Sequence, residues 1–254
     1  MATVEALKIG VEENEENLTE KLKKKKKIAV FGGDTPLELD QFSLYNLAYE
    51  IGKEIVCQKA LLLSGGTAEK GKSSIMSASL QGAIEVGGQT AAIKIVTEGL
   101  LRQEIVVLAK GLMATVKINP FGIEPSKSFF QETWSLIDIL DFKSNAEIMK
   151  PWLELALREV ALLVLSDSWI FLPGSIGTES ELNQAVQMIL RSEFLRLSQP
   201  KQKIILVSNF WQNKFAELKE RLGDKHQKHL VFIPSSGDSQ EMAFKAVSAA
   251  LEEF

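Results

Sequence analysis

The sequence predicts an α/β fold in which helices cover both faces of a parallel sheet. Short apolar runs alternate with helical patterns from residue 28 onward, and glycine-rich turns separate them. The runs at 28–31 and 60–63 are each followed closely by a pair of glycines and then by a helical pattern. Repetition of strand, glycine turn and helix is typical of parallel sheets with crossover helices. We therefore expect one domain from residue 28 to residue 254.

The predicted elements follow one another without a long linker. Apolar residues that run together predict strands at 28–31, 60–63, 91–96, 169–172, 203–207 and 230–233. Helices are predicted at 73–86, at 128–140, at 145–157, after 178, at 210–222, at 239–253, and over the apolar stripe Leu44, Leu47, Ala48, Ile51 and Ile55. The apolar run 103–109 is compatible with either a strand or part of a helix.

The first 27 residues differ in composition from the rest of the chain. Residues 12–20 are acidic, and residues 21–27 include six lysines. Blocks of like charge are usually solvated and mobile. We expect residues 1–27 to form a flexible extension. Its acidic part disfavours a role for the lysines in binding nucleic acid.

Composition excludes several classes of function. The net charge is −4, which gives no general attraction to nucleic acid or to an anionic membrane. No apolar run is long enough to span a membrane. Cys57 is the only cysteine, which excludes an internal disulfide and indicates a reducing compartment, so a cytoplasmic location is expected. Because the chain has only two histidines and one cysteine, a metal site built from histidines or thiolates is not expected. No bound cofactor is expected either.

The turn that follows the apolar run 169–172 is the strongest candidate for a ligand site. Glycines and Pro173 turn the chain there, and a helical stripe follows. Thr178 is a good N-cap, and Glu181 lies three residues further on, the spacing of a capping box. Free backbone N–H groups and the positive end of the helix dipole favour a phosphate at such a turn. Two interpretations of Glu181 are open, a helix cap or a functional carboxylate.

The segment PGSIGTESE, residues 173–181, resembles the PGGxGTxxE motif of the LOG ("Lonely Guy") family. That family comprises Rossmann-like cytokinin-nucleotide phosphoribohydrolases, long mislabelled lysine decarboxylases, within the SLOG group of nucleotide binders. One family glycine is replaced by Ser175. The family's Arg-Lys pair corresponds to Arg158 and Glu159, with Arg158 standing 15 residues before Pro173 as in the family.

The turn after the second predicted strand has two interpretations. Residues 66–73 match the GxxxxGK[ST] pattern of a P-loop, in which Lys72 contacts phosphates, Ser73 holds Mg²⁺ and Asp167 serves as the Walker-B carboxylate. The alternative is the GGGxxGLMG turn of the LOG family with about five residues inserted, in which Met76 matches the family methionine. In that case Lys70 and Lys72 either contact additional phosphates or belong to a solvated loop.

The resemblance implies a Rossmann-like domain that hydrolyses the N-glycosidic bond of a nucleoside 5′-monophosphate, giving a free base and ribose 5-phosphate. It implies a homodimer, with a small-molecule nucleotide as the ligand. Arg158 and Glu181 are the catalytic candidates. The nucleotide-binding candidates are Gly32, Gly33, Asp34, Gly65, Gly66, Met76, Pro173, Gly174, Ser175, Gly177 and Thr178. The alternatives are a nucleotide or cofactor binder without turnover, such as a molybdenum-cofactor carrier, and a P-loop NTPase.

Overall fold

The computed structural model describes residues 25–33, 40–65, 75–87, 90–95, 103–109, 112–118, 159, 162–191 and 202–253. For 90–95, 103–109 and 112–118 it describes the backbone only. The predicted flexible extension, apart from its last three residues, and the two helices predicted at 128–140 and 145–157 lie outside the described residues.

An eight-stranded sheet forms the centre of the described part, in the order β5-β4-β3-β2-β1-β6-β7-β8. Six strands are parallel to one another, namely β3, β2, β1, β6, β7 and β8. Strands β4 and β5 are antiparallel to their neighbours. Their bounds are β1 Lys27–Phe31, β2 Leu61–Ser64, β3 Thr90–Ile95, β4 Gln103–Ala109, β5 Leu112–Ile118, β6 Ser168–Phe171, β7 Ile204–Val207 and β8 Leu230–Ile233. The predicted fold class is confirmed, and the undecided run 103–109 is a strand.

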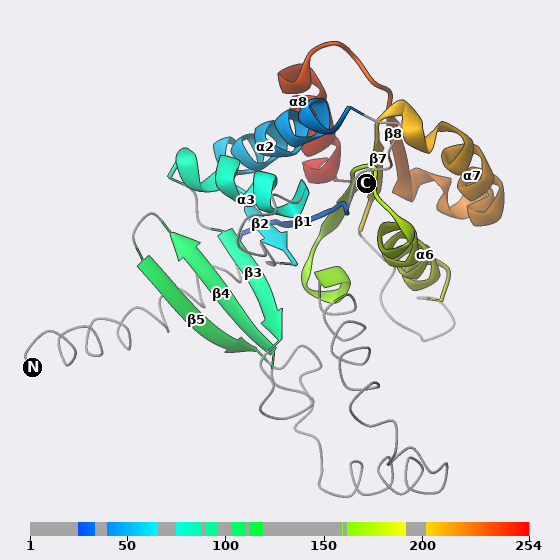
Figure 1. Ribbon diagram of the computed structural model, residues 1–254. Helices are drawn as coiled ribbons and strands as arrows, with labels where there is room; N and C mark the ends of the chain where they lie inside the picture. Colours follow the sequence, from blue (N-terminus) through cyan, green and yellow to red (C-terminus); the bar gives the residue numbers. More distant parts are fainter. Residues whose placement is uncertain are drawn as a thin grey trace, which may run out of the picture.

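Helices cover both faces of the parallel strands. Figure 1 shows α2, α3 and α8 on one side of the sheet and α6 and α7 on the other. Their bounds are α2 Gln41–Cys57, α3 Ile75–Glu85, α6 Ile176–Arg191, α7 Gln212–His226 and α8 Ser239–Leu251, with short 3₁₀ turns η2 Asn209–Trp211 and η3 Gln227–His229. The predicted helices that fall within the described residues are present, with ends displaced by a few residues.

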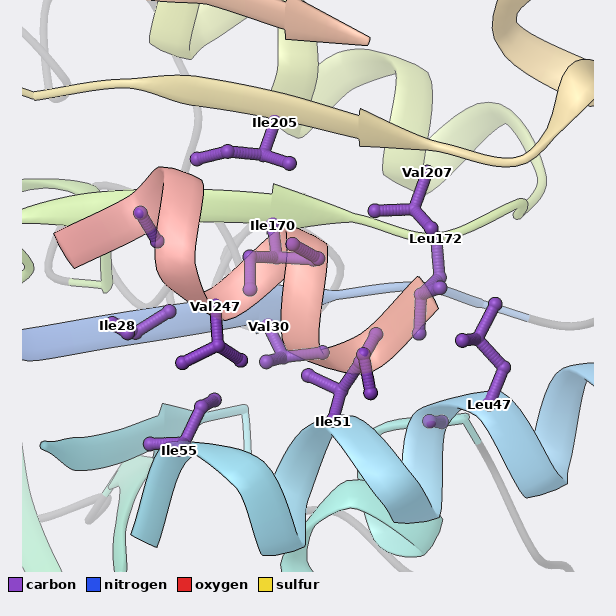
Figure 2. Close-up of a cluster of buried hydrophobic side chains, with 14 of the residues drawn as sticks. Ile28, Val30, Leu47, Ile51, Ile55, Ile170, Leu172, Ile205, Val207 and Val247 are labelled. Atoms are coloured by element: carbon purple, nitrogen blue, oxygen red, sulfur yellow. The ribbon is translucent and has the colours of Figure 1, made fainter. Parts of the chain in front are cut away.

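Successive strand residues point to opposite faces, so each face has its own core. Under α2 and α8, Val30, Ile170 and Val207 come from three neighbouring strands and pack against helix residues such as Ile51 and Val247, as Figure 2 shows. All five residues of the predicted stripe on α2 are buried in this core.

The opposite core lies beneath α6 and α7. Phe31 of β1 and Phe171 of β6 stack there, with ring centroids 4.8 Å apart. Leu182 and Val186 of α6 pack into the same cluster. These contacts hold the ends of β1 and β6 side by side.

Helices α2 and α3 cross at two glycines. A Cβ on Gly52 would lie 1.8 Å from the carbonyl oxygen of Ser79, and one on Gly82 would lie 2.0 Å from that of Tyr49. No side chain fits at either position, so the two backbones are in direct contact. The side chains of Tyr49 and Glu85 also hydrogen-bond across this pair.

The direction in which successive strands are added to the sheet reverses between β1 and β6. From β1 the chain proceeds through α2 to β2 and β3 on one side, and from β6 it proceeds through α6 to β7 and β8 on the other. Helices α2 and α6 lie on opposite faces. Open parallel sheets bind ligands outside the carboxyl ends of the strands at such a switch point. The turns after β1 and β6 are therefore the place to look for a site.

Candidate functional site at the ends of β1 and β6

Two glycine turns come into contact at the switch point. The N–H of Leu172 donates to the carbonyl of Phe31 across the strand ends, at 2.9 Å. A Cβ on Gly174 would lie 2.1 Å from Thr178 Oγ1 and 2.7 Å from Gly33 N. Glycine at position 174 therefore permits the turn after β6 to touch the turn after β1.

The start of α3 also reaches this point. A Cβ on Gly32 would lie 2.6 Å from Ile75 Cγ2 and 3.3 Å from Leu172 Cβ. Ile75 is the first residue of α3, so the turns after β1 and β6 and the helix that follows β2 meet at Gly32. The structure thus brings Gly32, Gly33 and Gly174 together, and their role in nucleotide binding stays a prediction.

Helix α6 begins three residues earlier than the capping-box spacing predicts. The carbonyl of Ser175 accepts from the N–H of Glu179 at 3.2 Å, so Ser175 occupies the N-cap position and Ile176 is the first helical residue. Thr178 lies inside the first turn and is buried. The prediction of Thr178 as the N-cap is wrong, and with it the interpretation of Glu181 as the partner in a capping box.

The N-terminus of α6 offers unpaired donors to a ligand. The N–H groups of Ile176, Gly177 and Thr178 have no carbonyl one turn back within the helix. Ser175, Ile176 and Gly177 are exposed, whereas Pro173 and Gly174 are buried. No atom lies within 4 Å of the position of a Cβ on Gly177. We refer to residues 173–178 as the cradle, which has a closed side against Gly33 and an open side at Gly177.

Glu181 is buried, with 6% of its surface exposed, in the second turn of α6. Two contacts orient this helix. Gln184 Nε2 donates to Glu159 Oε2 at 2.7 Å, and Arg221 Nη1 of α7 donates to Asn183 Oδ1 at 3.4 Å. Residues three apart on a helix are neighbours, so Glu181 lies near the edge that faces Glu159. Arg158 directly precedes Glu159 in the sequence and lies outside the described residues.

The remaining predicted site residues divide into two groups. Gly65 is buried directly after β2, and Met76 is half-buried in the first turn of α3, where its carbonyl accepts from Ser79 Oγ at 2.8 Å. The second group lies outside the described residues and consists of Asp34, Gly66, Lys70, Lys72 and Ser73. Their roles stay predictions.

Asp167 cannot serve as a Walker-B carboxylate. Residues 162–165 are helical, whereas that carboxylate follows a strand. Asp167 Oδ2 accepts from the N–H of Lys27 at 2.7 Å, at the start of β1. The residue therefore lies at the amino ends of the strands, opposite to the cradle, and this part of the P-loop interpretation is wrong.

The bond between Glu159 and Gln184 has no counterpart among the sequence predictions. The available signal was Glu159 itself, the carboxylate that replaces the family lysine. Within the described residues, no group of three or more histidine, cysteine or acidic side chains is placed to hold a metal ion. Nor does any helix in these segments combine the length and apolar character needed to cross a bilayer.

Comparison with known proteins identifies the fold. No protein-family model matches the chain, and no curated protein matches its sequence. The molybdenum cofactor binding protein from the phototrophic bacterium Rippkaea orientalis is 16% identical, with a TM-score of 0.50 over 90% of this chain and 99% of that chain. The protein TM1055 is 17% identical, with a TM-score of 0.50 over 88% of this chain and 98% of that one.

The molybdenum cofactor carrier protein from Chlamydomonas reinhardtii is 16% identical, with a TM-score of 0.48 over 90% of this chain and 99% of that chain. The two structures with a TM-score of 0.50 establish that this chain has a Rossmann-like α/β fold. The resemblance of residues 173–181 to the LOG motif stays a prediction.

Proposed function

We propose that this chain binds a nucleotide-like ligand at the carboxyl ends of β1 and β6, with a phosphate on the cradle. The observation that carries this proposal is the contact between Gly33 and Gly174 beneath the first turn of α6. It aligns a glycine turn from each strand with the unpaired N–H groups of one helix start. The positive end of the helix dipole, roughly half an elementary charge, favours an anion there.

Hydrolysis of the N-glycosidic bond is the reaction that Glu181 supports best. This carboxylate is buried beside the cradle, and the start of α6 at Ile176 excludes the capping-box role. Cleavage of a glycosidic bond passes through an oxocarbenium-like state, which a nearby carboxylate stabilises. By the resemblance to the LOG family, Glu181 and Arg158 act on the sugar, and water attacks the anomeric carbon as the base departs.

A second candidate function is binding without turnover. The fold shared with the Rippkaea orientalis molybdenum cofactor binding protein favours this function, because that protein binds a cofactor. In this case the cradle holds a phosphate of the cargo, and Glu181 contributes a hydrogen-bond acceptor. The same phosphate site serves both candidates, so binding alone does not separate them.

Release of free base from a panel of nucleoside 5′-monophosphates separates the two. A hydrolase releases base from at least one member of the panel, and Glu181→Gln abolishes the release because the amide neither takes a proton nor stabilises a cationic sugar. Glu179→Gln is the matched control, since Glu179 lies on the same helix and is exposed. Base release by Glu181→Gln at the wild-type rate would reject the catalytic assignment.

A P-loop NTPase is tested by a second assay. It would release inorganic phosphate from ATP or GTP in a Mg²⁺-dependent reaction, and Lys72→Ala would abolish that release. We expect no such activity, because the position of Asp167 removes the Walker-B carboxylate.

A further inference from the structure

The hydrogen bond between Gln184 and Glu159 joins two helices beside the candidate site. Glu159 has 7% of its surface exposed, and its Oε2 accepts from Gln184 Nε2 at 2.7 Å. Among the described residues, no lysine or arginine forms an ion pair with it. Burying a carboxylate is costly unless it is hydrogen-bonded. The amide of Gln184 therefore has a specific partner, and an apolar side chain would not replace it.

This bond lies close to Glu181 on the same edge of α6. Residues 181 and 184 are separated by three positions, which corresponds to roughly 4.5 Å along a helix axis. The contact between Asn183 and Arg221 lies on another part of the helix surface and faces α7. Since Glu181 and Gln184 are neighbours on the helix surface, Glu181 lies beside the edge that Glu159 contacts.

The helical residues 162–165, which directly precede β6, are held by other bonds. Trp169 Nε1 donates to the carbonyl of Leu163 at 3.1 Å, and Ser166 Oγ donates to that of Leu162 at 2.6 Å. These bonds fix the helix end that leads into the strand. Apolar packing between helices permits small sliding movements, whereas a hydrogen bond to a buried carboxylate is directional. The bond at Glu159 therefore gives α6 a directional contact with that residue.

We propose that Gln184 is a positioning residue of the site. By binding the Glu159 carboxylate, it fixes the position of the turn of α6 that carries Glu181. This inference rests on the proposed function, because it assigns to Gln184 the alignment of groups that act on the nucleotide. The cradle does not depend on it, since the contact of Gly33 with Gly174 forms on the other side of the helix start.

The variants Gln184→Leu and Glu159→Leu each remove the bond, and the exchange Gln184→Glu with Glu159→Gln restores an amide–carboxylate pair of the same total charge. Gln187→Leu is the matched control, because Gln187 is half-buried on the same helix. For each protein, base release from a nucleoside 5′-monophosphate, the Kd for inorganic phosphate and the melting temperature are measured. If wild type binds the nucleotide without turnover, the Kd for the nucleotide replaces the rate.

A small misplacement of a reacting group lowers the rate by about 10- to 100-fold, and that is the expected loss in kcat, or in nucleotide affinity, for Gln184→Leu. We expect its Kd for phosphate to remain within about twofold of wild type, since the cradle N–H groups are unaltered. The exchanged pair should recover most of the loss. Gln187→Leu should show none.

The proposal is overturned if Gln184→Leu melts at a lower temperature but keeps the wild-type rate and nucleotide affinity. It is also overturned if the exchanged pair is as impaired as the single variants, because the bond would then not be the cause. Absence of both phosphate and nucleotide binding in wild type would instead reject the proposed function, and this inference with it.

Discussion

Exchange of a single hydrogen for a methyl group at Gly174 tests the contact on which the site is built. In Gly174→Ala the new Cβ would lie 2.1 Å from Thr178 Oγ1, 2.7 Å from Thr178 Cβ and 2.7 Å from the backbone nitrogen of Gly33. Real Cβ atoms do not approach other heavy atoms so closely, so the two turns must move apart. Rotation of a flexible side chain does not relieve the clash, because one of the crowded atoms belongs to the backbone.

The magnitude follows from the cost of overpacking, typically about 1–3 kcal/mol. We expect about 3 kcal/mol for Gly174→Ala, because a buried backbone contact must yield. For a domain of this size, that corresponds to a fall in melting temperature of about 6–12 °C. Gly177→Ala is the matched control, since nothing lies within 4 Å of its Cβ position and the residue is helical. Alanine is a better helix former than glycine by about 1 kcal/mol, so this variant should be as stable as wild type or more so.

Urea unfolding of the three proteins, followed by far-UV circular dichroism, measures both changes. Inorganic phosphate is then titrated into each protein under native conditions. Gly174→Ala should lose stability and phosphate affinity together, because the cradle separates from Gly33. Wild-type stability in Gly174→Ala, or a comparable loss in Gly177→Ala, would refute the reasoning.

Three further predictions concern stability. Gly52→Ala should cost about 3 kcal/mol or more in urea unfolding, because its Cβ would lie 1.8 Å from Ser79 O, whereas Gly237→Ala should be neutral, with nothing within 4 Å. Burial lowers the pKa of His229 below its ordinary value of 6.5, so the unfolded chain binds the proton more tightly. The free energy of unfolding should then fall as pH drops through 6.5, and His229→Asn should flatten that dependence; an equal slope in both proteins contradicts it. Deletion of residues 1–20 should leave the melting temperature nearly unchanged, and a drop of many degrees would show that they dock on the domain.

The sequence predicts the parallel sheet well because its physical signals are local. A buried strand between helices is a short apolar run, and a glycine pair after it permits a tight turn. The stripe on α2 is equally direct, since its spacing of three and four residues matches one turn of a helix. All of these elements are recognised within a window of about 10 residues.

The start of α6 was not predicted because two residues compete for the N-cap. Serine and threonine cap helices about equally well. The sequence offers Ser175 and Thr178, and the spacing to Glu181 favoured Thr178. In the structure Thr178 lies inside the first turn and its side chain is close to Gly174, which in turn contacts Gly33. That contact joins turns far apart in the chain, so no local pattern reports it.

The antiparallel strands β4 and β5 illustrate the same limit. The apolar run 103–109 has no periodicity that separates a strand from a helix, and its pairing with β3 decides it. The bond of Gln184 to Glu159 is likewise invisible in the sequence. For Asp167 the sequence predicted too much. The P-loop motif suggested that this residue is a Walker-B carboxylate, and the helical conformation of 162–165 excludes that role.

Calorimetric titration of the wild-type protein with AMP, adenosine and inorganic phosphate tests the central claim most directly. The proposed site holds the ligand through its phosphate at the N-terminus of α6. AMP should therefore bind at least about tenfold more tightly than adenosine, a difference of about 1.4 kcal/mol, and inorganic phosphate should compete with AMP. Adenosine binding as tight as AMP, or AMP binding that phosphate leaves unchanged, would contradict a phosphate site at residues 173–178.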